Sequence, residues 1–231
     1  MSNFLKKQIE KVYIKSGEIE FKKIQKTIDK FNIEKENLSV LDVGSGLCIF
    51  PLYFSKKNNK LKFSCVDINQ ELVELAKSHN FEAYKSNILN LPFDDNSFDI
   101  VHCSHVIEHL KYPDVINAIN ELFRVCKKNG IVIIRTPLRV NHRFYNDIDH
   151  IRPYPPDAII NFFNNEQQQQ KGKIEIKEIK RWYTRVYFEF DYNRFPFKIV
   201  KSVNQFLKLM WLFINFPIDR PNNYGIVFKK K

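Results

Sequence analysis

The residues best suited to chemistry follow an apolar run near the start of the chain. There the sequence reads Leu41-Asp42-Val43-Gly44-Ser45-Gly46, which predicts a strand that ends in Asp-x-Gly-x-Gly and then enters a helix. The two glycines permit a tight turn, and their missing side chains let a ligand approach the backbone. Amides at the start of the helix are free to meet a polar ligand. The segment predicts a nucleotide-type site, although an ordinary strand-to-helix turn would also explain the glycines.

A carboxylate at the end of a second apolar run strengthens this hypothesis. Asp67 follows Gly46 by 21 residues, the spacing at which an acid holds a ribose diol, because its two oxygens can accept from two vicinal hydroxyls. A dinucleotide fingerprint would place a third glycine where the chain has Ile49, which argues against an NAD-dependent dehydrogenase. No Gly-Lys-Ser/Thr follows the glycines, so the sequence also lacks a phosphate-binding loop of the P-loop type.

Four histidines stand where a general base would be useful, since imidazole exchanges protons near neutral pH. His105 and His109 follow the apolar run 98–103, and a spacing of four puts them on one face if the segment is helical. His142 and His150 lie in a polar loop further along. No convincing cluster of metal ligands is evident. The four cysteines are expected to be reduced core residues: Cys48, Cys65, Cys103 and Cys126.

Apolar periodicity predicts the elements that position these groups. Strands are expected at 39–43, 62–66, 98–103, 130–135, within 173–190 and at 224–228, and helices within 4–32 and at 51–57, 69–78, 115–126 and 195–216. Strands that alternate with helices predict a mostly parallel sheet covered on both faces. The polar stretch 138–156 is interpreted as a long functional loop.

Length and charge limit the number of domains, the location and the partners that the protein can have. The 231 residues suffice for one substantial domain. No signal-peptide core follows the start and no apolar run has the length of a membrane span, so we expect a cytoplasmic protein. The net charge is +11, and the residues from 171 onward hold 14 Lys and Arg against 5 Asp and Glu. Such a basic region attracts phosphorylated substrates, nucleic acid or an anionic membrane surface, or is only a solvated face.

Several segments, in order, resemble the class I S-adenosylmethionine (SAM)-dependent methyltransferases, in particular the small-molecule group called type 11. The resemblance runs from about Leu38 to Pro137 and rests on five segments: 41–46, 66–69, 87–93, 98–110 and 121–130. It implies a Rossmann-like α/β fold with a seven-stranded, mostly parallel sheet, helices on both faces and a helical, aromatic insertion before the last strand. The implied organisation is a helical lead-in at 1–37 and one domain at 38–231. That domain divides into a SAM-binding core at 38–137, a substrate-side region at 138–223 and a last strand at 224–231.

The resemblance also implies roles for individual residues. Gly44 and Gly46 would line the methionine part of SAM, Asp42 would help to place its amino group, and Asp67 would hold the ribose. Asn87 stands where the family commonly has Asp near the adenine amine, so it keeps an acceptor oxygen but loses the charge. The full set implied to bind SAM, or the product S-adenosyl-L-homocysteine, is Asp42, Gly44, Ser45, Gly46, Asp67, Ile68, Asn87, Ile88, Ser104 and His105.

Methyl transfer from a sulfonium is an in-line displacement that alignment can accelerate without a metal. His150 is the first candidate for a base or substrate contact, because 149–154 looks like the segment that closes over the substrate in relatives. The alternative for His150 is a hydrogen-bonded residue that shapes the loop. His109 is the second candidate, although the Glu108-His109 pair is often structural in the family.

The expected function is transfer of a methyl group to a small-molecule, sugar or lipid-linked acceptor. The aromatic and basic stretch 181–216 is interpreted as a lid or core helix, a membrane-surface helix through 203–216, or a stacking surface. Nucleic acid is disfavoured, because no Asn/Asp-Pro-Pro-Tyr follows the run 98–103. No obligate protein partner is evident. The alternative is a non-catalytic SAM-fold protein that binds a partner through its C-terminal region.

Overall fold

A computed structural model describes residues 3–31, 37–138, 144–145, 147–164, 175–184, 197–214 and 223–231. The strands are β1 (Leu38–Val43), β2 (Leu61–Asp67), β3 (Glu82–Lys85), β4 (Phe98–Ser104), β5 (Cys126–Pro137), β6 (Ile176–Thr184) and β7 (Asn223–Lys230). The helices are α1 (Asn3–Phe31), α2 (Ile49–Ser55), α3 (Gln70–Ser78), α4 (Asp114–Val125), α5 (Pro156–Asn164) and α6 (Phe197–Ile214), with a short 3-10 helix η1 (Ile107–His109).

The strands form one seven-stranded sheet in the order β3-β2-β1-β4-β5-β7-β6. β7 runs antiparallel between β5 and β6, and the pairs among β1 to β5 are parallel. Val43 at the end of β1 pairs with Val66 on one side and Cys103 on the other. The chain therefore leaves three neighbouring strands at the same edge, which is where open α/β sheets bind ligands.

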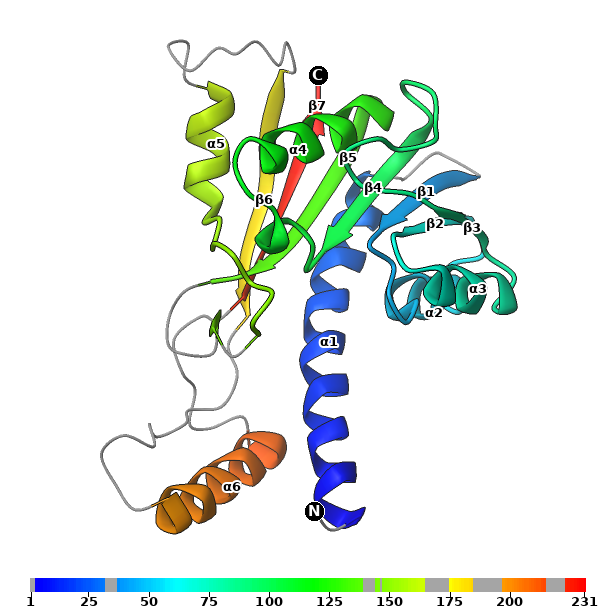
Figure 1. Cartoon of the computed structure of the whole chain (residues 1–231). Coiled ribbons are helices and arrows are strands. Elements are labelled where there is room, and N and C mark those ends of the chain that lie inside the picture. The colour runs from blue at the N-terminus through cyan, green and yellow to red at the C-terminus, as the bar shows by residue number, and fades with distance from the viewer. Residues whose placement is uncertain are drawn as a thin grey trace.

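Helices cover both faces of this sheet, as the sequence predicts (Figure 1). Residues that alternate along β5 point to opposite faces. Ile131 and Ile133 join a core with residues of α1 and α2, and Val132 and Ile134 join a second core with residues of α4 and α5. Both faces of the sheet are therefore covered by apolar side chains of the helices. This explains why the sequences of the strands are continuous apolar runs.

The segment 4–32, in which the sequence predicts one or two helices, forms the single helix α1 over its described residues. Its second half packs Phe21, Ile24 and Ile28 into the core beside β1 and α2, and its first half extends beyond the edge of the sheet towards α6 (Figure 1). α1 contacts both β6 and α6. The helix expected as a lead-in thus supplies one of the layers on the sheet.

Three elements differ from their sequence-based expectations. β3 escapes the periodicity analysis because its side chains are mostly exposed and show no apolar alternation. α5 begins at Pro156, in a stretch interpreted as loop, because proline is well tolerated in the first turn of a helix. β5 begins at Cys126, directly after α4, and its pairing with β4 shifts register between Phe98 and Ile100.

Candidate functional site

The turn after β1 is held in a conformation that suits glycine. Gly44 and Gly46 have φ values of 71° and 50°, in the left-handed region that side chains disfavour. A Cβ on Gly44 would lie 2.3 Å from Cγ2 of Val106, whereas a Cβ on Gly46 would meet nothing within 4 Å. Gly44 therefore allows close packing against the loop after β4, and Gly46 leaves space above the turn.

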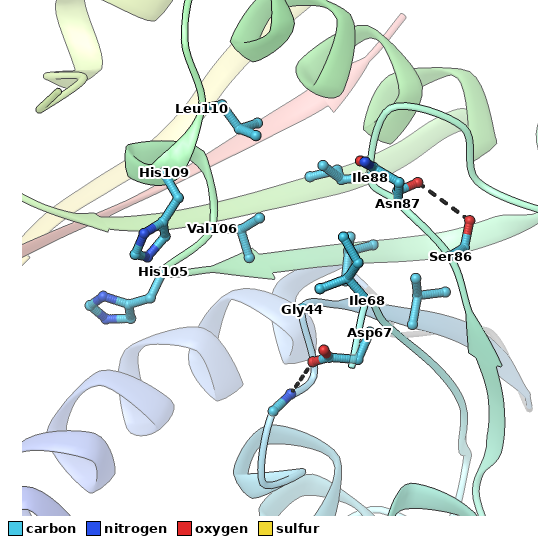
Figure 2. Close-up of a pocket in the computed structure, with 13 residues that line it drawn as sticks. Gly44, Asp67, Ile68, Ser86, Asn87, Ile88, His105, Val106, His109 and Leu110 are labelled. Carbon is cyan, nitrogen blue, oxygen red and sulfur yellow. Dashed lines mark hydrogen bonds between the residues drawn. The ribbon is translucent and has the colours of Figure 1, made fainter. Parts of the chain in front are cut away.

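Asp67 joins the end of β2 to this turn. Its buried carboxylate accepts from the Gly46 amide through Oδ2 at 2.9 Å (Figure 2). Its Oδ1 accepts from the Asn69 amide, also at 2.9 Å. Each carboxylate oxygen has two lone pairs, so both can accept a further hydrogen bond. The carboxylate is thus fixed beside the glycine turn with acceptor capacity to spare.

A first cavity of about 430 Å³ lies against these residues, within the size range of small-molecule sites. The residues of the predicted SAM-binding set that line it are Gly44, Gly46, Asp67, Ile68, Asn87, Ile88 and His105. Figure 2 shows Asp67 on one side of this space, with Asn87 and Ile88 on another. The loop 86–93 forms that second wall.

Helix α4 fixes the loop 86–93. Glu121 accepts from the Leu91 amide at 2.9 Å, and Arg124 donates to the carbonyls of Leu91 and Phe93. Within the loop, Oδ1 of Asn87 accepts from the Leu89 amide at 3.0 Å. The oxygen expected to face an adenine amine therefore already closes a local turn and has one lone pair left.

A second cavity, of about 770 Å³, shares Gly44 and His105 with the first. It is lined by Asp42, Ser45 and Ser104, by residues of α1 and α2, and by Arg135 of β5. Every residue of the predicted SAM-binding set lines one cavity or the other. His105, with a φ of 55°, stands at the junction in a left-handed conformation, which is uncommon for a residue other than glycine.

Sequence analysis missed two groups in the second cavity. His102 is buried on β4, stacks on Phe50 with ring centroids 3.7 Å apart, and places Nδ1 2.7 Å from Oδ1 of Asp42. Arg135 forms a buried ion pair with Glu20 of α1, and burial lowers the pKa of its guanidinium to about 10. A polar residue inside an apolar strand is the signal that would have singled out both positions.

Three buried polar atoms in this wall have no hydrogen-bond partner among the described residues. They are Oγ of Ser45, Nε2 of His102 and Nε of Arg135. A buried polar atom without a partner is costly, so the wall of the second cavity is suited to a polar ligand.

The two candidate bases lie next to each other, but they are placed differently. His109 lines the first cavity. His150 lines neither cavity; its Nδ1 is 2.7 Å from the Phe144 carbonyl, and its ring packs on Phe144 and His109. This is the loop-shaping arrangement named as the alternative, so a role of His150 as a base stays a prediction. His142 lies outside the described residues.

Comparison with known proteins decides what this architecture is. Residues 41–134 match the family model described as a methyltransferase domain. The chain contains a methyltransferase domain. This methyltransferase domain has the class I fold, since the order of its strands, with β7 antiparallel, is that of the class. A solved SAM-dependent methyltransferase from Archaeoglobus fulgidus shares the fold with a TM-score of 0.59, at 22% identity over 93% of this chain and 94% of that one.

Two curated relatives are also methyltransferases by name. The uncharacterized methyltransferase YcgJ of Bacillus subtilis is 32% identical over 60% of this chain and 50% of its own length. The ubiquinone/menaquinone biosynthesis C-methyltransferase UbiE of Rickettsia felis is 30% identical over 52% of this chain and 53% of its own length. The chain thus spans about half the length of the curated relatives it matches.

A methyltransferase domain of this type implies SAM as the methyl donor, and the residues present fit that molecule. The first cavity offers Asp67 to a diol, the turn at Gly46 is free of side chain, and apolar residues line the remaining wall. No helix in the described ranges is both long and apolar enough to cross a membrane.

Proposed function

We propose that this protein transfers the methyl group of SAM to a small-molecule acceptor that occupies the second cavity. The observation that carries the proposal is that Gly44 and His105 line both cavities. A donor with its ribose and adenine in the first cavity would reach Asp42, Ser45 and Ser104 in the second with its methionine part. It would then meet the acceptor at this junction, where alignment of reacting atoms about 3–3.5 Å apart accelerates displacement strongly.

Bound SAM supplies a methyl group already activated on a sulfonium. The chain would hold and orient SAM. Asp67 would accept hydrogen bonds from the ribose hydroxyls, and the glycine turn leaves room for the ligand beside the backbone. His105 stands on the acceptor side of the junction, half-exposed, where its imidazole can take a proton from an acceptor hydroxyl or amine. His109 and His150 remain candidates for this role.

The acceptor is a molecule with a polar group and an apolar body. Nε of Arg135 and Nε2 of His102 are buried and have no hydrogen-bond partner among the described residues. Phe21, Phe50 and Tyr53 line the same cavity. The name of UbiE, a quinone-pathway C-methyltransferase, supports an acceptor of this mixed character.

A lipid-linked acceptor is the finer form of this proposal. Helix α6 exposes an apolar stripe formed by Ile199, Val203, Phe206 and Phe213. Exposed Lys198 and Lys201 flank it, which is the composition of a helix that lies on an anionic membrane surface. Residues 215–216 of the expected membrane segment lie outside the described residues. In this arrangement, the core 38–137 would hold the cofactor, and the region 138–223 would serve the acceptor mainly through α6, because only Asn223 among the described residues of that region lines the second cavity.

Calorimetric titration with S-adenosylhomocysteine tests the proposal, with NAD as a control ligand and Asp67→Ala as the variant. We expect micromolar binding of S-adenosylhomocysteine alone, lost in Asp67→Ala. An absence of binding by protein that unfolds cooperatively would refute the enzyme hypothesis. It would leave the alternative, a non-catalytic protein of this fold that binds a partner through its basic aromatic region.

A further inference from the structure

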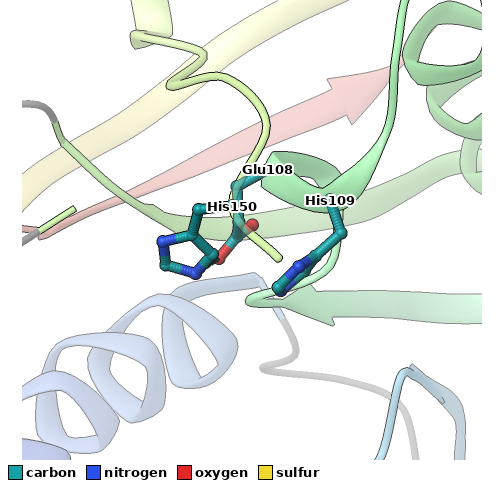
Figure 3. A group of neighbouring side chains, drawn as sticks. All are labelled: Glu108, His109 and His150. Carbon is teal, nitrogen blue, oxygen red and sulfur yellow. Dashed lines mark ion pairs between the residues drawn. The ribbon is translucent and has the colours of Figure 1, made fainter. Parts of the chain in front are cut away.

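Three side chains of types that commonly bind metal ions meet beside the first cavity, and they come from two distant parts of the chain. Glu108 and His109 lie in η1, and His150 follows in the loop after β5. One ligand atom from each lies within 4.8 Å of the others. Figure 3 shows the Glu108 carboxylate between the two imidazoles. The Glu108 carbonyl accepts from the amides of Ile151 and Arg152, which brings the loop with His150 to η1.

Both imidazoles are oriented by backbone carbonyls. Nδ1 of His109 lies 3.0 Å from the Asp149 carbonyl, and Nδ1 of His150 lies 2.7 Å from the Phe144 carbonyl. A carbonyl oxygen only accepts hydrogen bonds, so each Nδ1 carries a proton and Nε2 is the nitrogen left to bind an ion. This is the arrangement that protein metal sites use to fix the tautomer of a histidine ligand. Oδ2 of Asp147 lies 3.7 Å from Nε2 of His150.

The Glu108 carboxylate is the third group and is completely buried. Its Oε2 accepts from the Thr136 hydroxyl at 2.9 Å. Its Oε1 has no hydrogen-bond partner within the described part of the chain. The nearest ring nitrogens are Nδ1 of His105 at 3.3 Å and Nε2 of His150 at 4.0 Å. A buried carboxylate oxygen without a partner is unfavourable unless a cation stands close to it.

We propose that Glu108, His109 and His150 bind one divalent transition-metal ion through Oε1 and the two Nε2 atoms. Two imidazoles and one carboxylate are a donor set suited to zinc and to other borderline ions such as cobalt or iron. Ligand bonds of about 2.0–2.2 Å would hold the three atoms closer together than they lie now, so small rotations of the side chains complete the site.

The ion would sit in the wall of the cofactor cavity, because His109 lines that cavity. Three protein ligands leave a coordination position open, and an ion with an open position polarises the oxygen that occupies it. The ion would thereby favour acceptors with a hydroxyl or carbonyl oxygen. This role rests on the proposed function, whereas the binding of the ion does not.

Titration of the chelator-treated, tag-free chain with Co²⁺ tests the site, with visible absorption as the signal and calorimetry with Zn²⁺ in parallel. We expect one equivalent to bind, with d–d bands typical of nitrogen and oxygen ligands. Thiolate charge-transfer absorption should be missing, because the four cysteines are buried and none is among the proposed ligands.

Two variants remove one ligand atom each and keep the fold. In His150→Asn and His109→Asn, the amide nitrogen replaces Nδ1 as donor to the backbone carbonyl, while Nε2 is lost. Each should weaken binding of Co²⁺ by at least about 10-fold, as changes around metal sites commonly do. His79→Asn is the matched control, because His79 is exposed at the end of α3 and its loss should leave the titration unchanged.

The outcomes of the metal and S-adenosylhomocysteine titrations distinguish the metal-site proposal from the methyl-transfer proposal. Stoichiometric Co²⁺ binding without S-adenosylhomocysteine binding supports the metal site and refutes the methyl-transfer proposal. The metal site is overturned if the protein unfolds cooperatively, and is therefore folded, but binds neither Co²⁺ nor Zn²⁺. Equal binding by wild type and both Asn variants also overturns it.

Discussion

Nδ1 of His102 lies 2.7 Å from Oδ1 of Asp42, and this buried pair joins β4 to β1 directly beneath the glycine turn. The imidazole also stacks on Phe50 of α2. The pair thus ties two central strands to the helix that follows the turn, in a place where each partner would otherwise be a buried polar group without a hydrogen bond.

Removal of either partner should therefore destabilise the protein, and the two losses of unfolding free energy should not be additive. We expect His102→Ala to lower the free energy of unfolding in urea by about 2–4 kcal/mol, from lost packing and an unpaired Asp42. Asp42→Asn should cost less, and the double variant less than the sum. The surface variant His79→Ala is the control, with a change within about 0.5 kcal/mol. Strict additivity of the two losses would argue against a coupled pair.

The two glycines of the turn should respond differently to alanine. Gly44→Ala adds left-handed strain of about 1–2 kcal/mol and a clash with Val106, so a total loss of about 2–4 kcal/mol in unfolding free energy is expected. Gly46→Ala adds only the strain, about 1–2 kcal/mol. Val106→Ala in the Gly44→Ala background should restore part of the loss. Equal losses for the two glycines would contradict the packing role of Gly44.

The cysteines should be unreactive in the folded protein. All four are buried; burial raises the pKa of the Cys126 thiol to about 12 and raises the pKa of the Cys65 and Cys103 thiols as well. Because the thiolate is the nucleophile, a disulfide reagent at pH 8 should modify four thiols in denaturant and none rapidly in the native state.

The raised pKa of Cys126 makes the stability of the fold depend on pH. A folded-state pKa raised above the ordinary value of about 8.5 favours the folded form while the thiol stays protonated. The stability contributed by Cys126 is therefore present below about pH 8.5 and is lost as the pH rises towards 12. Unfolding in urea at pH 7.5 and pH 10, compared between wild type and Cys126→Ala, measures this. An identical pH dependence in the two proteins would contradict it.

Helix α6 should mediate binding to anionic vesicles. Phe206→Ser with Phe213→Ser removes two exposed aromatic side chains, 61% and 76% exposed, and should weaken binding in a sedimentation assay by about 10-fold or more. Ile148→Ser, which removes an exposed apolar side chain from the loop after β5 and not from α6, should have no effect. Added salt should weaken binding by screening the flanking lysines. Vesicle binding that is unchanged in the double variant would leave the stripe without this role.

The cofactor side of the site could be predicted from the sequence because its parts are local. Gly46 lies three residues after β1 and Asp67 is the last residue of β2, and two parallel strands in register bring these ends together. The strand spacing and the turn residues therefore indicate both the ligand type and the edge of the sheet where it binds. The same patterns predict most helices and strands, whereas exposed β3 leaves no apolar signal.

Only the tertiary structure decides what the polar residues between these elements do. In the sequence, His102 is one residue within an apolar strand. Only the structure reveals its contacts with Asp42 and Phe50. Glu108 and His150 lie 42 residues apart, and two backbone hydrogen bonds from the loop bring them together. The sequence by itself determined the sheet, the glycine turn and the acid beside it, because strand and helix periodicity depend on near neighbours. The second cavity and the cluster of Glu108, His109 and His150 depend on long-range packing of α1 and the loop after β5, which no local pattern encodes.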